Sequence, residues 1–157
     1  MQLRRGITGI YSNHGDPPVV PTTDVKAFRS HCHLAARAVG AKLQTIKDRY
    51  DGVGICNFAI AYFEFSDAIV AALLNVVHPV IAFAKCPVDG QVTFDYVDCP
   101  KLAEEFRCLG AYSIAGCAEL NQPLVRELCE DLAPDEVKRV RYFRPMRVGD
   151  VIFNFWD

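Results

Sequence analysis

Short apolar runs separated by turn-forming residues dominate the middle of the chain. Four of these runs span residues 55–65, 68–75, 79–85 and 91–97. Each is rich in aromatic or β-branched residues, which favour strands, and a few turn-forming residues separate it from the next. Connections this short leave no room for crossover helices, so the runs predict an antiparallel meander. The first run is apolar on both faces, which indicates that part of the sheet is covered on both sides.

One of the four runs is ambiguous. Residues 68–75 follow Ser66 and Asp67, which could cap a helix, and alanine and leucine favour a helix. We expect a strand here. The same reading of apolar and turn-forming residues predicts further strands at 3–11 and 42–47, a short strand or extended link at 111–114, and loops at 13–21 and 48–54.

A helix is predicted before the meander, over residues 23–39. Thr22 or Thr23 can cap its N-terminus, and Gly40 is placed to end it. Its apolar residues fall on one face at helical spacing: Val25, Phe28, Cys32, Ala35, Ala36 and Val39.

Two more helices are predicted after the meander. The first, 100–109, opens with Pro100, because proline is favoured in a first helical turn. The second is expected over 122–141, with its leucines facing inward and a restart of the helix at 133–136.

The C-terminal tail, 141–157, ends on bulky apolar residues. More of them share one face in a helix than in a strand, so we expect a short helix after Pro145. Each apolar side chain left in water would forfeit about 1.5–3 kcal/mol, and the tail should therefore dock onto the core. The helical stripe comprises Val148, Val151, Ile152, Phe155 and Trp156.

Together these elements predict a single α+β domain over residues 1–157. Its core would be an antiparallel meander sheet of about five to seven strands. Helices would pack mainly on one face of this sheet, and the apolar tail would pack against the core.

The formal net charge of −2 conceals an uneven distribution. Residues 1–50 carry eight basic and three acidic side chains, residues 51–136 carry four and fourteen, and residues 137–157 carry five and two. A nucleic-acid-binding protein would not concentrate negative charge in this way, so no nucleic-acid partner is expected. An acidic middle is more compatible with a basic protein partner.

Part of this acidic charge falls on adjoining helices. It could be an ordinary solvated face. It could also be a docking surface, whose negative charge would speed the encounter with a basic partner and fix its orientation. The candidate partner-binding residues are Glu119, Glu127, Glu130, Asp131, Asp135 and Glu136.

The seven cysteines form no Cys-x-x-Cys pair, and several lie at apolar positions, where a free cysteine acts as a small hydrophobe. This usage is typical of a reducing compartment, so we expect a cytoplasmic protein. The N-terminus lacks the apolar stretch of a secretory signal. The least charged run, 68–84, is broken by polar residues and proline, so no membrane span is expected.

Three patterns could carry chemistry, but each has a simpler interpretation. Residues 31–33, His-Cys-His, could bind a metal, but neighbours one or two apart on a helix point in different directions. His78 with Cys86 or Cys99 would suit a cysteine/histidine hydrolase, but no nucleophile motif surrounds any cysteine. Residues 52–54, Gly-Val-Gly, lack the third glycine of a phosphate-binding loop. We expect no metal, no cofactor and no catalytic residue.

The tail also resembles a known group of proteins. Its pattern is Arg-Tyr-Phe-Arg-Pro at 141–145 followed by Val-Gly-Asp-Val-Ile-Phe-Asn-Phe-Trp-Asp at 148–157. This pattern resembles the closing segment of small bacterial immunity proteins encoded beside secreted polymorphic toxins. The turn at 98–100 and the helix start at 120–124 are similar to that group as well. These residues are expected to hold the fold together, so no toxin-contacting residue follows from the resemblance.

The resemblance implies an immunity protein that binds the effector domain of a cognate toxin and neutralises it without catalysis. A basic, nuclease-like toxin would suit the charge distribution. Two alternatives stay open. One is a small cysteine/histidine hydrolase, and the other is a structural subunit of a larger assembly.

Overall fold

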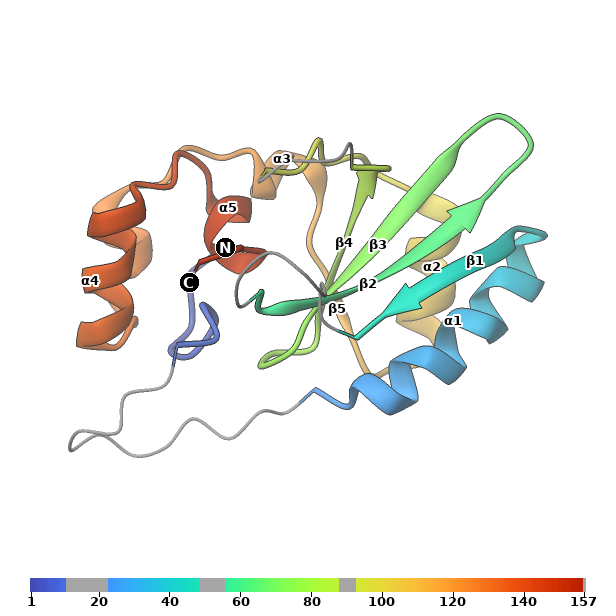
Figure 1. The fold of residues 1–157 in the computed structure, drawn as a ribbon, viewed down its shortest axis with the longest axis horizontal. Helices are drawn as coiled ribbons and strands as arrows, with labels where there is room; N and C mark the ends of the chain where they lie inside the picture. Colours follow the sequence, from blue (N-terminus) through green and yellow to red (C-terminus); the bar gives the residue numbers. More distant parts are fainter. Residues whose placement is uncertain (11–22, 49–55, 88–92, 157) are drawn as a thin grey trace.

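The computed structural model of the protein describes residues 1–10, 23–48, 56–87 and 93–156. Its centre is a five-stranded sheet in the order β1-β2-β3-β4-β5 (Figure 1). β1 to β4 pair as consecutive antiparallel neighbours, and β5 pairs with β4 in parallel. The predicted α+β class with a meander core is confirmed. The strands are β1 (Lys42–Lys47), β2 (Phe58–Glu64), β3 (Ile69–Asn75), β4 (Val80–Lys85) and β5 (Ser113–Ile114).

The ambiguous run 68–75 is a strand, as predicted. In the β2–β3 hairpin Phe58 pairs with Asn75 and Glu64 with Ile69. The N–H of Phe65 donates to the carbonyl of Ala68 at 2.8 Å, which closes the turn between the two strands. The alanine and leucine side chains of β3 are buried, so burial in the sheet outweighs their preference for a helix.

Two helices cover one face of the sheet, α1 (Val25–Val39) and α2 (Pro100–Cys108). The predicted α1 is confirmed, but Asp24 rather than a threonine caps it, accepting a hydrogen bond from the N–H of Ala27 at 2.9 Å. Gly40 ends it in a left-handed conformation, with φ 68°. The buried core between these helices and the sheet comprises Phe28, Cys32, Ala35, Ala36, Ala59, Ala61, Phe63, Ala72, Leu74, Ile81, Phe83, Leu102, Ala103 and Phe106.

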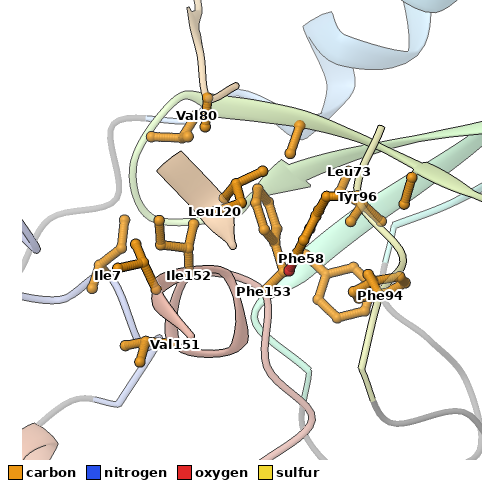
Figure 2. Close-up of a cluster of buried hydrophobic side chains, with 14 of the residues drawn as sticks. Ile7, Phe58, Leu73, Val80, Phe94, Tyr96, Leu120, Val151, Ile152 and Phe153 are labelled. Atoms are coloured by element: carbon orange, nitrogen blue, oxygen red, sulfur yellow. The ribbon is translucent and has the colours of Figure 1, made fainter. Parts of the chain in front are cut away.

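The opposite face is covered by segments from both ends of the chain. They include the N-terminal residues, the short helices α3 (Cys117–Leu120) and α5 (Val148–Ile152), and the tail. Figure 2 shows Phe94 and Phe153 beside Phe58, with ring centroids 5.3 and 6.4 Å from that ring. Residues 148 and 151–153 are fully buried. The predictions of a terminal helix and of a docked tail are therefore confirmed, and the sheet is covered on both faces.

The prediction of a helix over 122–141 is wrong for the residues before the predicted restart at 133–136, and it is confirmed from that restart onward. This segment contains the 3₁₀ helix η1 (Arg126–Cys129) and the helix α4 (Pro134–Phe143), and it lies on the side opposite α1 and α2 (Figure 1). The N–H of Leu124 donates to the carbonyl of Met146 at 2.9 Å. Because residues 122–124 are extended and paired with the chain after α4, they cannot join a helix.

The prediction of a strand over 3–11 is wrong for residues 3–10, which form consecutive turns. Gly6 and Gly9 adopt left-handed conformations, with φ 84° and 77°. The N–H groups of Ile7 and Gly9 donate to carbonyls three residues earlier. Leu3 and Ile7 are nevertheless buried, because the turns bring both side chains onto the core.

Residues 93–97 form no regular strand, although a strand was predicted over 91–97. Tyr96 forms an isolated bridge with Ala84. β5 pairs with the first residues of β4, so only the far end of the same edge is left for this segment. The predicted loop 13–21, most of the loop 48–54 and residues 91–92 lie outside the described residues.

Candidate functional site

The candidate acidic residues lie in three separate places. Glu119 is on α3, where its carboxylate lies 3.8 Å from the N-terminal amino group. The three residues of the middle group, Glu127, Glu130 and Asp131, are exposed on η1 and the turn after it. Asp135 lies in the first turn of α4 and pairs with Lys138 at 2.8 Å.

Glu136 is fully buried and cannot belong to a docking surface. One carboxylate oxygen accepts hydrogen bonds from the N–H groups of Gly6 and Ala133, at 2.8 and 2.9 Å. The other accepts from the hydroxyl and the N–H of Thr8, at 2.6 and 3.2 Å. A buried carboxylate needs such donors, and here they fasten the N-terminal turns to the start of α4. The N3 position of Glu136, three residues after the cap Ala133, could have signalled the bond to Ala133 but not the bonds to Gly6 and Thr8.

The acidic residues of η1 share their surface with basic side chains. η1 packs beside α4, which carries exposed Lys138, Arg139 and Arg141. Counting charges along the sequence separated these two groups, because the acidic part ends at residue 136 and the basic part begins at 137. The fold brings them together into one surface of mixed charge.

A groove of about 570 Å³ runs between η1 and α4. Its floor is apolar, since Leu124, Val137 and Val140 are half-buried against the core. Glu130 follows η1 shortly before α4 begins, and Arg141 lies in the last turn of α4. The residues that line it are Leu124, Val125, Arg126, Cys129, Glu130, Val137, Val140 and Arg141.

Exposed large hydrophobic side chains gather around α4. Of five such residues in the described part of the chain, three lie here: Val125 is 45% exposed, Tyr142 77% and Met146 81%. The other two are Met1 and Leu34. Tyrosine, methionine and arginine are the residue types enriched at protein interfaces, so this part of the surface has the composition of a binding face.

The residues of the tail pattern have structural partners. Arg147 lies 2.8 Å from Asp150, donates to Asn121 at 2.9 Å, and lies over the ring of Tyr96. The hydrogen bond with Asp150 raises the pKa of Arg147. A Cβ at Gly149 would lie 2.6 Å from Cζ of Tyr96, so only glycine fits against that ring. This segment holds the fold together, as the sequence predicted.

Aromatic rings continue this arrangement beyond α5. The rings of Phe143 and Trp156 stack, with centroids 5.3 Å apart and an interplanar angle of 4°. They line a second cleft, of about 660 Å³, together with Arg144 and Met146. Arg144 ends α4 in a left-handed conformation, with φ 50°. This ring pair ties the end of α4 to the tail.

The structure does not bring His78 and Cys86 together. His78 precedes β4 and Cys86 follows it, so about 20 Å of strand separates them at about 3.3 Å per residue. Nε2 of His78 lies 2.8 Å from the carbonyl oxygen of Arg5. His78 lines a cavity of about 470 Å³, and no cysteine is among the described residues around it. Cys99 lies before α2, in another pocket.

The three residues of the His-Cys-His pattern at 31–33 have different surroundings on α1: His31 is half-buried, Cys32 is buried and His33 is exposed. Cys32 is buried in the core, and burial raises the pKa of its thiol. Nδ1 of His31 lies 2.7 Å from the hydroxyl of Tyr112, whose pKa burial raises to about 12. In the described ranges, no three histidine, cysteine or acidic side chains are grouped so that they could hold a metal ion. The helices in those same ranges are all too short or too polar to cross a membrane.

Comparisons with known proteins give no match. The chain matches no protein-family model, and neither the curated proteins nor the solved structures include one similar to it.

Proposed function

We propose that the protein acts by binding another protein, and that this partner is the effector domain of a cognate secreted bacterial toxin. The observation that carries the proposal is the surface formed by η1 and α4. Exposed acidic, basic and apolar side chains meet there, next to a groove with an apolar floor. Apolar anchors surrounded by charged residues are what a specific protein interface requires.

The resemblance of the tail to bacterial immunity proteins supports the choice of a toxin as the partner. The tail residues themselves pack against the core, so they account for a shared fold rather than for shared contacts. The protein would neutralise the toxin by covering its active site or by blocking assembly of that site. Neither route requires chemistry from the protein.

Three of the predicted acidic residues fit this proposal. Glu127, Glu130 and Asp131 are exposed and clustered, so they would attract a basic toxin over a distance of about a Debye length, roughly 8–10 Å in physiological salt. Such charges raise the association rate more than they lower the dissociation rate.

Co-expression tests the proposal. The probe is the C-terminal domain of a large secreted protein encoded immediately upstream, expressed in a bacterium with and without this protein. We expect growth to be rescued by the protein and a stable complex to be purified. Toxicity that the protein does not relieve, together with no binding between the purified pair, contradicts the proposal.

Charge reversal then tests the surface. The triple variant E127K/E130K/D131K should associate with the toxin domain more slowly, and its association rate should depend less on salt. The matched control reverses three acidic residues on the other side of the molecule, D67K/E104K/E105K, which changes the net charge equally. If the association rate falls by the same factor in both variants, only the net charge of the protein matters and the η1 surface has no special role.

A further inference from the structure

The groove between η1 and α4 has opposite charges at its two ends. Glu130 follows η1 and lies four residues before Pro134, where α4 begins. Arg141 lies in the last turn of α4, four residues after Val137 and therefore about 6 Å further along the helix axis. Both charged residues line the groove. The bond from the N–H of Leu124 to the carbonyl of Met146 keeps the start of η1 beside the end of α4. The polarity of the groove is therefore fixed by the fold.

The charges at the two ends have no side-chain partner among the residues that the structure describes. In the described part of the chain, Arg126, Glu130 and Arg141 form no ion pair and no side-chain hydrogen bond. Asp135 pairs with Lys138 and Arg147 with Asp150, so these charges are already engaged. Arg126, Glu130 and Arg141 are available to pair with a bound partner beside the apolar floor.

We propose that this groove receives one segment of the toxin, which carries an apolar side chain between an acidic and a basic residue. The apolar side chain would lie over Leu124, Val137 and Val140, against exposed Val125. The acidic residue would face Arg141 and the basic residue would face Glu130. This inference rests on the proposed function and adds the chemistry and the direction of the bound segment.

Charge complementarity fixes that direction. A segment bound the opposite way would place like charges together at both ends of the groove, and their repulsion would disfavour this orientation. The apolar contact supplies affinity, because it removes both surfaces from water. The groove volume of about 570 Å³ lies within the range of specific binding pockets.

A second copy of the chain is a poorer occupant. Two copies related by a twofold axis could pair Glu130 of one with Arg141 of the other. However, each copy would present a concave groove to the other, and the space between them would stay unfilled. A convex segment of a different protein fits better.

Cys129 provides a direct test, because its thiol lines the groove. Burial raises the pKa of Cys129, so alkylation with N-ethylmaleimide is followed at pH 8.5, where more of the thiol is ionised. The toxin domain should slow alkylation of Cys129 at least tenfold. Exposed Cys86 and Cys108 lie outside the groove, and their rates should not change.

Variants test the apolar contact and the direction of the bound segment. V125D should weaken binding of the toxin domain at least tenfold, whereas L34D, at an exposed residue of α1, should not. The swap E130R/R141E keeps the net charge and should weaken binding more than either single reversal. Circular dichroism and thermal unfolding establish that each variant is folded, and the Cys129 measurement on the unaltered protein does not depend on any variant.

The outcomes separate the two proposals. A complex in which Cys129 reacts as fast as in the free protein overturns the groove and leaves the immunity function standing. Protection of Cys129 that increases with the concentration of the protein alone identifies a second copy as the occupant and also overturns it. If the protein neither rescues growth nor forms a complex with the toxin domain, both the immunity function and the groove proposal are overturned.

Discussion

Asn57 and Asn75 donate hydrogen bonds to the same two carbonyl oxygens. The side-chain amide of Asn57 lies 2.8 Å from the carbonyl of Ile7 and 2.9 Å from that of Ile152. The amide of Asn75 lies 2.8 and 2.7 Å from the same atoms. Asn57 precedes β2 and Asn75 ends β3, and both are buried. The pair therefore joins the two ends of the chain to the end of the central hairpin.

Replacing Asn75 should destabilise the protein strongly. Its side-chain oxygen also accepts hydrogen bonds from the N–H groups of Val77 and His78. In N75A these groups lose their partner, and each buried group left unpaired costs about 1–3 kcal/mol. We expect the free energy of unfolding in urea to fall by about 2–4 kcal/mol.

The control for N75A is Q44A, on the exposed side of β1. Gln44 bonds to Glu64 at the surface, where a substitution changes stability by less than about 0.5 kcal/mol. If the free energy of unfolding falls equally in the two variants, the buried hydrogen bonds of Asn75 contribute no more to stability than a surface contact.

Glu136 should matter for stability and not for binding. In E136Q one side-chain oxygen becomes an amide, which cannot accept from the donors that face it, Gly6 and Ala133 or Thr8. We expect a loss of about 2–3 kcal/mol in unfolding free energy and faster proteolysis of the N-terminal turns. The folded variant should bind the toxin domain as tightly as the unaltered protein. E127Q is the matched control, and it should leave stability unchanged.

The elements that could be predicted from the sequence are those set by local pattern. α1 carries its apolar face, its cap region and Gly40 within one stretch of chain, and the meander carries its turns between its strands. The short helix α5 was predicted because more of the apolar residues of the tail share one face in a helix than in a strand. The docking of the tail was predicted because these residues are too apolar to remain in water.

The features that could not be predicted depend on distant parts of the chain. Asn57 and Asn75 look like residues at the edges of strands, and nothing near them shows that both face Ile7 and Ile152. Glu136 looks like one more charge on a helix, because its donors Gly6 and Thr8 lie far away in the sequence. The groove forms because residues 122–124 pair with residues 146–148. The prediction of a helix over 122–141 did not allow for this pairing.

Removing the hydroxyl of Tyr96 should stabilise the protein. This oxygen is buried and has no hydrogen-bond partner in the described part of the chain, and burial raises its pKa. Y96F removes an unpaired polar group and keeps the ring against Gly149, so we expect a gain of about 1 kcal/mol in unfolding free energy. G149A should instead cost about 1–3 kcal/mol, because its methyl group would overlap the ring. A loss of stability in Y96F would indicate a partner for the hydroxyl.

The buried thiol of Cys32 should make stability fall at alkaline pH. Burial raises the pKa of this thiol in the folded protein. In the unfolded chain the same thiol ionises at about pH 8.5. Above that pH the unfolded chain releases a proton that the folded protein keeps, so ionisation favours unfolding. For this one group the loss is about 1.4 kcal/mol for each pH unit above 8.5.

Urea unfolding of the protein and of C32A at pH 7 and pH 9.5 measures this effect. C32A should be less stable at pH 7, because it leaves a cavity between α1 and the sheet. The difference between the two proteins should then shrink by about 1.4 kcal/mol at pH 9.5, since C32A lacks the group that ionises. Tyr96 and Cys129 titrate in both proteins and cancel in the comparison. Burial raises the pKa of Tyr112 to about 12, so its hydroxyl stays protonated in the folded protein at pH 9.5. A difference that stays constant with pH would show that Cys32 ionises as easily in the fold as in the unfolded chain.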